Sequence, residues 1–277
     1  LVDEHARQDQ ARFEALEAMN RMLPVALRCE QLRHYVASAW LDNWDHLNYR
    51  MENTGFTVRD GQPRAMTVDF GSCGPLGFRN LRNGVLLPKA ASGDIAMVQR
   101  PPALFPIPDA YVHRADSFDT GGDDPGALQD TLRWPYGFQS ESIVEMLRPP
   151  VAADPAVADT LAEMGYRLAL LPRTAIDAIV QQGWQAPEAQ STTPWPDADA
   201  FIRQLDARRN TLLGRYDAAT LAQWVNDDPE RAAQVREEMR EAVRQAFGPG
   251  AAGTPCLEEL DHRHRTVSEG VLPGIAP

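Results

Sequence analysis

The stretch from His34 to Gly71, HYVASAWLDNWDHLNYRMENTGFTVRDGQPRAMTVDFG, decides how the rest of the chain is interpreted. Its central part is a polar segment with the carboxylate, amide and imidazole side chains of Asp42, Asn43, Asp45, His46, Asn48 and Asn53. Two runs with strand-like composition follow, and the stretch closes on Asp69-Phe70-Gly71. Carboxylate and amide oxygens are the ligands that Mg²⁺ prefers. Candidate metal ligands therefore stand both before and after the strand-like runs.

The two strand-like runs predict a β-hairpin. Residues 54–58 (TGFTV) and 65–68 (AMTV) are rich in β-branched and aromatic side chains, and Asp60-Gly61 between them is typical of a tight turn. The second strand then ends at Asp69. Because Phe70-Gly71 allows the chain to turn sharply, we expect the Asp69 carboxylate to face an open cleft.

Helices are predicted on both sides of this stretch. Residues 3–22 form an amphipathic pattern, and Pro24 is suited to the first turn of a second helix. The apolar face of that second helix contains Leu32, Tyr35, Val36 and Ala39. The two helices lead directly into the polar segment.

The C-terminal half of the chain has the pattern of a helical bundle. Helices are predicted to start at Asp154-Pro155, Thr174, Asp197, Asp217 and Asp228-Pro229, and the last is predicted to stop at Gly248. Residues 249–277, with several Gly and Pro, are expected to form a loosely ordered tail. The predicted fold class is α+β, mainly α, with one domain over residues 1–248 followed by the tail.

Composition excludes several classes of protein. The net charge of −12 argues against a nucleic-acid partner, because phosphate contacts need clustered Lys and Arg. Cys29, Cys73 and Cys256 are odd in number and far apart, which predicts no disulfide framework and a reducing compartment. No apolar run has the roughly 20 residues that a transmembrane helix needs. We expect a soluble protein without a transmembrane segment or a Sec-type signal.

The order of polar loop, hairpin and Asp69-Phe70-Gly71 resembles the C-lobe core of the protein-kinase-like superfamily. Residues 43–47 (NWDHL) followed by residues 53–56 (NTGF) are similar to bacterial persistence-toxin and secreted-effector kinases, which are themselves similar to phosphoinositide kinases. The resemblance covers about residues 30–80. It implies a kinase-like C-lobe that uses ATP and Mg²⁺, with Asp45 as catalytic base and with Asp69 and an asparagine of the loop as cofactor and metal ligands.

The metal-binding asparagine has two candidates. In the families that the chain resembles, this residue usually follows the catalytic aspartate by five positions, but Arg50 stands there in this chain. We favour Asn53, which directly precedes the first hairpin strand. If Asn48 were the ligand, the position of the catalytic base would fall on Asn43, which would indicate a pseudokinase or a mutated active site.

The residues before the loop do not resemble a kinase N-lobe. Kinases bind phosphate with a lysine and a glycine-rich turn ahead of the catalytic loop, whereas the preceding residues here are predicted to be helical and lack lysine. Lys89, the single lysine, follows the Asp-Phe-Gly motif. We therefore expect a C-lobe whose N-lobe is absent from this chain, as in a fragment.

Several of these residues also have simpler interpretations. Asp42 and Asp45 would cap a helix equally well, with Trp44 in the core, and His46 would then be a structural hydrogen-bonding residue. Two further pairs are interpreted as surface groups: Arg208 and Arg209 as surface or salt-bridging residues, and His262 and His264 as part of a solvated tail in preference to a metal site.

The predicted function is that of an ATP- and Mg²⁺-dependent phosphotransferase of bacterial origin, acting on a lipid or protein hydroxyl. The low lysine content of the chain is typical of a GC-rich bacterial genome. Loss of lysine to escape ubiquitin tagging in a host cell is the alternative explanation. Localisation is predicted to be cytoplasmic, or in a host cell after secretion as a virulence effector with a host protein as partner. Two alternatives stay open: a catalytically inactive kinase-like interaction module, and a nucleotidyl transferase on the same fold.

Overall fold

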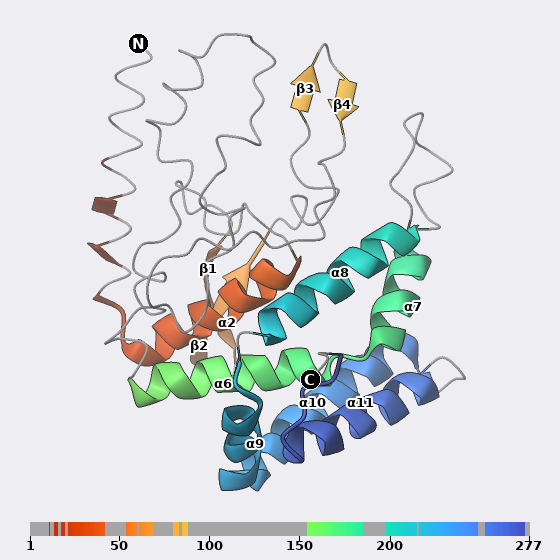
Figure 1. Cartoon of the computed structure of the whole chain (residues 1–277). Helices are drawn as coiled ribbons and strands as arrows, with labels where there is room; N and C mark the ends of the chain where they lie inside the picture. Colours follow the sequence, from red (N-terminus) through yellow and green to blue (C-terminus); the bar gives the residue numbers. More distant parts are fainter. Residues whose placement is uncertain are drawn as a thin grey trace. The chain divides into compact units, whose positions relative to one another are not determined.

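The computed structural model divides the chain into two compact units, with the boundary inside one helix after Thr160. The first unit contains the elements before that point, and the second contains the helices that follow (Figure 1). The prediction of one domain over residues 1–248 stays a prediction. The residues that the structure describes are 11, 14–15, 18–19, 22–41, 54–59, 61–68, 80–82, 85–87, 154–184, 198–214, 216–248 and 253–274.

Helix α2 (Val25–Leu41) is the main helix of the first unit that the structure describes. It starts where Pro24 was predicted to open a helix, and the Pro24 carbonyl oxygen accepts hydrogen bonds from the amides of Leu27 (2.9 Å) and Arg28 (3.2 Å). Three residues of the predicted apolar face, Leu32, Tyr35 and Val36, are fully buried. The prediction for this helix is confirmed, whereas the helix predicted for residues 3–22 lies largely outside the described residues.

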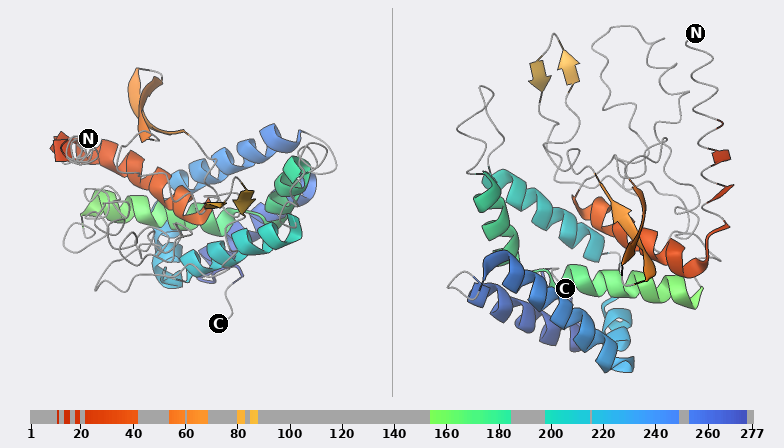
Figure 2. Two further views of the ribbon diagram at one scale, coloured as in Figure 1. Left: turned by 90° about the horizontal axis from the view of Figure 1, so that it is seen from above. Right: turned by 180° about the vertical axis from the view of Figure 1, so that it is seen from behind.

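The predicted β-hairpin consists of β1 (Thr54–Arg59) and β2 (Gln62–Thr67). The strands are antiparallel, with Thr54 opposite Thr67 and Arg59 opposite Gln62, which leaves a two-residue turn. Gly61 in this turn has a φ of 74°, a conformation that favours glycine. The hairpin lies beside α2 in both views of Figure 2, and β2 makes the contact.

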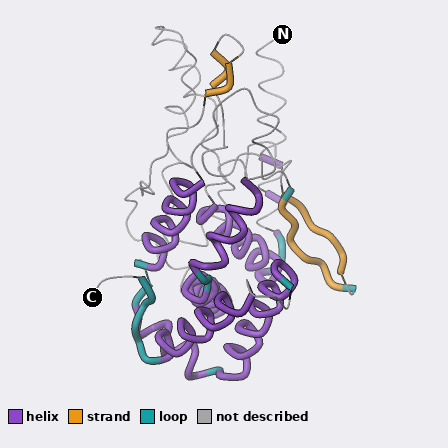
Figure 3. The backbone as a smooth tube through the Cα atoms, turned by 90° about the vertical axis from the view of Figure 1, so that its right-hand side faces the viewer, coloured by secondary structure: helices purple, strands orange, loops and turns teal. Residues whose placement is uncertain are grey.

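A second, smaller hairpin pairs β3 (Asn80–Arg82) with β4 (Val85–Leu87). All other elements that the structure describes are helices, as Figure 3 shows by colour. The predicted fold class, α+β and mainly α, is therefore confirmed, whereas the kinase-like C-lobe stays a prediction. None of the described helices combines the length and apolar character that crossing a lipid bilayer requires.

Helix α6 (Pro155–Leu170) begins at the predicted position, where Asp154 Oδ1 accepts a hydrogen bond from the Ala156 amide (2.9 Å). Its predicted apolar positions are buried, with exposed fractions of 7% or less: Val157, Leu161, Met164 and Leu168. Helix α7 (Arg173–Trp184) and helix α8 (Ala198–Leu213) follow within a residue of their predicted starts.

Two predicted aspartate caps are confirmed. Asp217 accepts a hydrogen bond from the Thr220 amide (2.9 Å) at the start of α9 (Ala218–Asp227). Asp228 accepts one from the Arg231 amide (3.0 Å) at the start of α10 (Pro229–Phe247). Gly248 ends α10 with a φ of 65°, which explains why the helix stops at a glycine.

Helix α11 (Gly253–Ser268) occupies the region that was expected to be a loosely ordered tail. Its buried positions Cys256, Leu260 and Val267 recur at helical spacing, so the helix is held by packing. It contacts α7, α9 and α10. The expectation failed because the Gly and Pro residues lie at the ends of this segment, where they delimit the helix.

Gly165 in α6 allows close contact with an aromatic ring. A Cβ atom at this position would lie 2.6 Å from Tyr216 Cε1. We predict that Gly165→Ala lowers the free energy of unfolding by about 1–3 kcal/mol, because the ring has to shift. The control is Gly183→Ala in α7, where no atom lies within 4 Å of the added Cβ and stability should be unchanged or slightly raised. Urea unfolding measures both, and equal stability of the two variants would contradict the prediction.

Candidate functional site

The four residues predicted to form the site lie outside the described residues. They are Asp45, Asn48, Asn53 and Asp69. The structure does describe the elements on either side of them: α2 ends at Leu41, β1 begins at Thr54 and β2 ends at Thr67. Helix α2 and the β1–β2 hairpin are thus the frame that flanks the candidate loop and the Asp-Phe-Gly motif in the chain.

The base of the β1–β2 hairpin is joined to α2 by a side-chain hydrogen bond. Thr54 and Thr67 form the last pair of the hairpin, and the Cα atoms of residues opposite each other lie about 5 Å apart in such a ladder. Thr67 Oγ1 lies 2.8 Å from Nδ1 of His34 on α2. Burial lowers the pKa of His34, and the nearby Glu30 carboxylate only partly opposes this effect. The neutral imidazole is thus the favoured form in this contact.

An ion pair joins the same two elements one turn earlier on α2. Glu30 Oε1 accepts hydrogen bonds from Arg33 Nη1 on its own helix (2.8 Å) and from Arg64 Nη1 on β2 (3.2 Å). Arg64 is 55% exposed, so solvent weakens this pair. Ala65, by contrast, is buried on the hairpin. The half-buried contact of His34 with Thr67 is therefore the better-shielded polar link between α2 and the hairpin.

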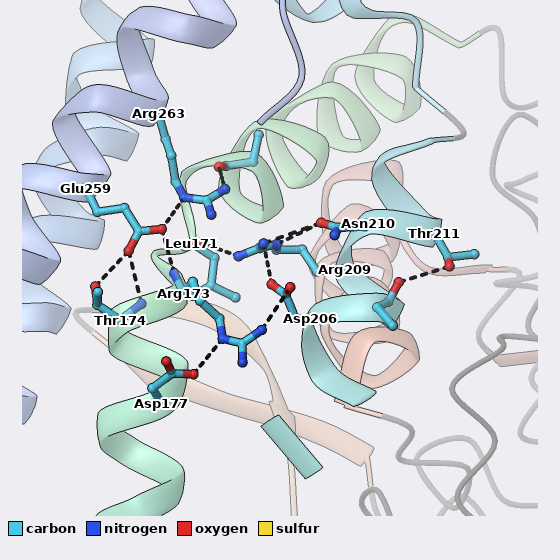
Figure 4. A network of polar contacts seen from close by, with 12 residues as sticks. Leu171, Arg173, Thr174, Asp177, Asp206, Arg209, Asn210, Thr211, Glu259 and Arg263 are labelled. Atoms are coloured by element: carbon cyan, nitrogen blue, oxygen red, sulfur yellow. Dashed lines mark hydrogen bonds and ion pairs between the residues drawn. The ribbon is translucent and has the colours of Figure 1, made fainter. Parts of the chain in front are cut away.

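A network of polar contacts lies in the second unit, among α7, α8 and α11 (Figure 4). Glu259 on α11 accepts hydrogen bonds from the amides of Arg173 (2.8 Å) and Thr174 (3.0 Å), which start α7, and from Thr174 Oγ1 (2.8 Å). Arg263 Nε also donates to Glu259 (2.7 Å). Burial opposes ionisation of Glu259, but these donors outweigh it and lower the pKa to about 2. Glu259 therefore caps α7 from another helix.

Arg209 on α8 is a buried member of this network, with an exposed fraction of 2%. Its Nη1 donates to the Leu171 carbonyl oxygen (2.8 Å), and its Nη2 pairs with Asp206. Asp206 also pairs with Arg173 Nη1 (2.9 Å). Burial and the neighbouring Arg263 lower the pKa of Arg209 to about 10, so the guanidinium remains charged at neutral pH.

The expectation that Arg208 and Arg209 lie at the surface is wrong, since both are only 2% exposed. The salt-bridging interpretation is confirmed for Arg209, which pairs with Asp206. A signal for burial was present in the sequence. The two arginines follow Leu205 by three and four positions and precede Leu212 by four and three, so they share the face of these buried leucines.

His264 on α11 belongs to an aromatic cluster and not to a tail. The buried Tyr166 hydroxyl and His264 Nδ1 are hydrogen-bonded (2.8 Å), and burial raises the pKa of Tyr166 to about 12. The Tyr166 ring packs on Trp224, with 5.5 Å between centroids, and the Arg231 guanidinium lies 5.8 Å from the Trp224 ring centroid. Arg231 also pairs with Glu163 (2.9 Å). These contacts hold α6, α9, α10 and α11 together.

Neither network has the donor set of a metal centre. Within the part of the chain that the structure describes, no three His, Cys, Asp or Glu side chains are grouped so that they could hold a metal ion. Glu163, Asp206 and Glu259 are each engaged by arginine. The arrangement in the second unit is therefore one of helix packing and capping.

Comparison with known proteins adds no relative. No family model, no curated protein and no solved structure shows significant similarity to the chain. Function is therefore inferred from the residues of the chain and from the frame described above.

The cap provided by Glu259 generates a prediction about stability and pH. The pKa of folded Glu259, about 2, lies below its ordinary value of 4.5, so the stabilisation is complete above about pH 5 and is lost as the pH falls toward 2. We predict that Glu259→Gln lowers the free energy of unfolding at pH 7 by about 1–2 kcal/mol, after allowance for solvent screening.

Urea unfolding at pH 7 and at pH 3 measures this effect. The difference between wild type and Glu259→Gln should shrink at the lower pH. Glu258→Gln, at an exposed position of the same helix, is the matched control and should behave like the wild type. A difference that is independent of pH would contradict the assignment of Glu259 as an ionised cap.

Proposed function

We propose that the protein is an ATP- and Mg²⁺-dependent phosphotransferase that acts on a protein or lipid hydroxyl. The observation that carries the proposal is the register of the β1–β2 hairpin, in which Thr54 is opposite Thr67. Asn53 directly precedes Thr54, and Asp69 follows Thr67 by two positions. This register supports the proposal, because two ligands of one metal ion have to leave the hairpin from the same end.

The donor set fits magnesium. An amide oxygen from Asn53, or from Asn48 as the alternative, and a carboxylate from Asp69 are hard ligands, and Mg²⁺ in nucleotide sites takes only one or two carboxylates. The ion neutralises charge on the nucleotide phosphates when it is bound. Asp45 would orient the acceptor hydroxyl and accept its proton.

The contacts of the carboxylates in the second unit support a metal site in the first unit. Two carboxylates of the second unit, those of Glu259 and Asp206, are engaged by arginine or by backbone amides. Recruiting them for a metal would break these contacts, at a cost of several kcal/mol for a buried pair. The proposed chemistry therefore belongs to the first unit.

Isothermal titration calorimetry with ATP, in the presence and absence of Mg²⁺, tests the metal site. The wild type should bind nucleotide in a Mg²⁺-dependent manner, and Asp69→Ala should lose this dependence because a ligand is removed. Asp60→Ala, in the turn at the opposite end of the hairpin, is the control and should bind like the wild type. Equal binding by all three proteins, or no binding by any, would refute the proposal.

A second variant separates binding from chemistry. Asp45→Asn should bind Mg²⁺ and ATP normally but lower the rate of transfer by roughly 10²–10⁴-fold, since the general base is lost. Mass spectrometry of an acceptor incubated with protein and ATP reads out the reaction. A phosphate adduct supports the proposal, whereas a nucleotide adduct would indicate nucleotidyl transfer, and no adduct on any acceptor would favour an inactive interaction module.

A further inference from the structure

The hydrogen bond between Tyr166 and His264 joins α6 to α11 inside the second unit. The hydroxyl oxygen and Nδ1 lie 2.8 Å apart, and the two rings meet edge to face with 6.2 Å between their centroids. Tyr166 is fully buried, and His264 follows the buried Leu260 by four positions and precedes the buried Val267 by three. His264 therefore lies on the packed face of α11, and its ring is part of the joint between the two helices.

This bond contains a group that can take up a proton and a partner that cannot compensate for it. Neutral imidazole has one donor and one acceptor nitrogen, whereas the protonated ring has two donors and no acceptor. Where Nδ1 accepts the Tyr166 hydroxyl hydrogen, a proton taken from solvent at Nδ1 removes that acceptor. Burial raises the pKa of Tyr166 to about 12, so its hydroxyl stays neutral and offers no negative charge to an imidazolium.

The charged groups nearest to His264 favour its neutral form. Burial lowers the pKa of His264, Arg236 on α10 and Arg265 on α11 act in the same direction, and Asp261 on α11 opposes them. The Asp261 carboxylate is already paired with Arg240 on α10. A protonated ring would therefore stand among cations, with its closest carboxylate shared.

Other charges on the surrounding helices are paired as well. Glu163 on α6 pairs with Arg167 and with Arg231 on α10. Glu259 pairs with Arg263 where α11 meets α7. On α9 the neighbour of this joint is the uncharged Trp224 ring, which packs on Tyr166. A positive charge on His264 would have to compete with an existing ion pair for any of these carboxylates.

We propose that the Tyr166–His264 bond is an acid-sensitive joint: uptake of one proton by His264 breaks it and loosens α11 from the rest of the second unit. The inference is independent of the proposed function, since each residue that carries it belongs to the helical unit. Opening of this joint exposes the side chains that α11 buries, which include Cys256, Leu260 and Val267.

The direction of the pH response follows from the lowered pKa of His264. The ordinary value is 6.5, so below that pH an opened α11 binds more proton at His264 than the closed one does. The stabilisation by the closed joint is therefore complete above about pH 6.5 and is lost as the pH falls. Because a single proton is taken up, the opening equilibrium should increase by at most about tenfold for each pH unit.

The thiol of Cys256 provides a local probe of opening in the full-length protein. It is free and 1% exposed on α11, and the buried free Cys29 reports on the first unit. Both are labelled with 4,4′-dithiodipyridine at several values between about pH 7.5 and 5, the range in which histidine titrates, and are quantified by peptide mass spectrometry. Dividing each rate by that of the urea-unfolded chain at the same pH removes the effect of pH on thiol reactivity. Labelling of Cys256 in the wild type should accelerate as the pH falls.

Three variants assign the response to the joint. His264→Asn keeps an acceptor near the position of Nδ1 but cannot titrate, so labelling of Cys256 should become independent of pH while Cys29 behaves as in the wild type. Arg236→Gln removes a cation that faces His264 and should weaken the acid response. The matched control is His262→Asn, at an exposed position of the same helix, which should respond like the wild type.

Each outcome supports or overturns the inference. An acid response of Cys256 that is lost in His264→Asn and kept in His262→Asn would support it. Wild-type labelling of Cys256 that does not change with pH would overturn it, and so would an equal response in the wild type and His264→Asn. If His264→Asn does not fold, Arg236→Gln decides, because an undiminished acid response in that variant contradicts the role of the cations around His264.

Discussion

The contact between α2 and the β1–β2 hairpin is the interaction on which the frame of the candidate site depends. Two strands cannot bury an apolar face by themselves, and β1 leaves Phe56 and Val58 partly exposed. Helix α2 contacts β2, and the bond of His34 to Thr67 and the ion pair of Glu30 with Arg64 join the two elements. Packing and the bond to Thr67 together make the hairpin part of the unit.

The second unit is organised by a different constraint, the need to satisfy buried charge. Arg209 is almost completely buried and remains charged, so it requires acceptors, which Asp206 and the Leu171 carbonyl provide. Glu259 in turn requires donors and finds them at the first turn of α7. Each of these groups would destabilise the fold if its partner were removed. Ion pairing therefore specifies how α7, α8 and α11 meet, and this explains why arginine occurs on their packed faces.

Features encoded within a few residues could be predicted from the sequence, and features that join distant segments could not. The caps at Asp217 and Asp228 and the Asp60-Gly61 turn depend on neighbouring residues, and the structure has helices and a hairpin there. The bond of His34 to Thr67 and the cap on α7 by Glu259 span 33 and 85 or more residues and leave no local pattern. The four residues of the candidate site were predicted from the order of the polar loop, the hairpin and the Asp-Phe-Gly motif alone. Their roles stay a prediction.

The distribution of partners among the acidic residues bears on where metal chemistry can occur. A chain with a net charge of −12 has more carboxylates than cationic groups, and one guanidinium can engage two carboxylates, as Arg244 does with Glu237 and Glu241. In the second unit the buried carboxylates, such as Glu163, are engaged by arginine. A divalent cation binds where carboxylates are not already neutralised, because it otherwise has to displace a bound guanidinium. Glu163, Asp206 and Glu259 are therefore poor candidates for metal ligands, and the metal site that we propose draws its carboxylate from outside the second unit.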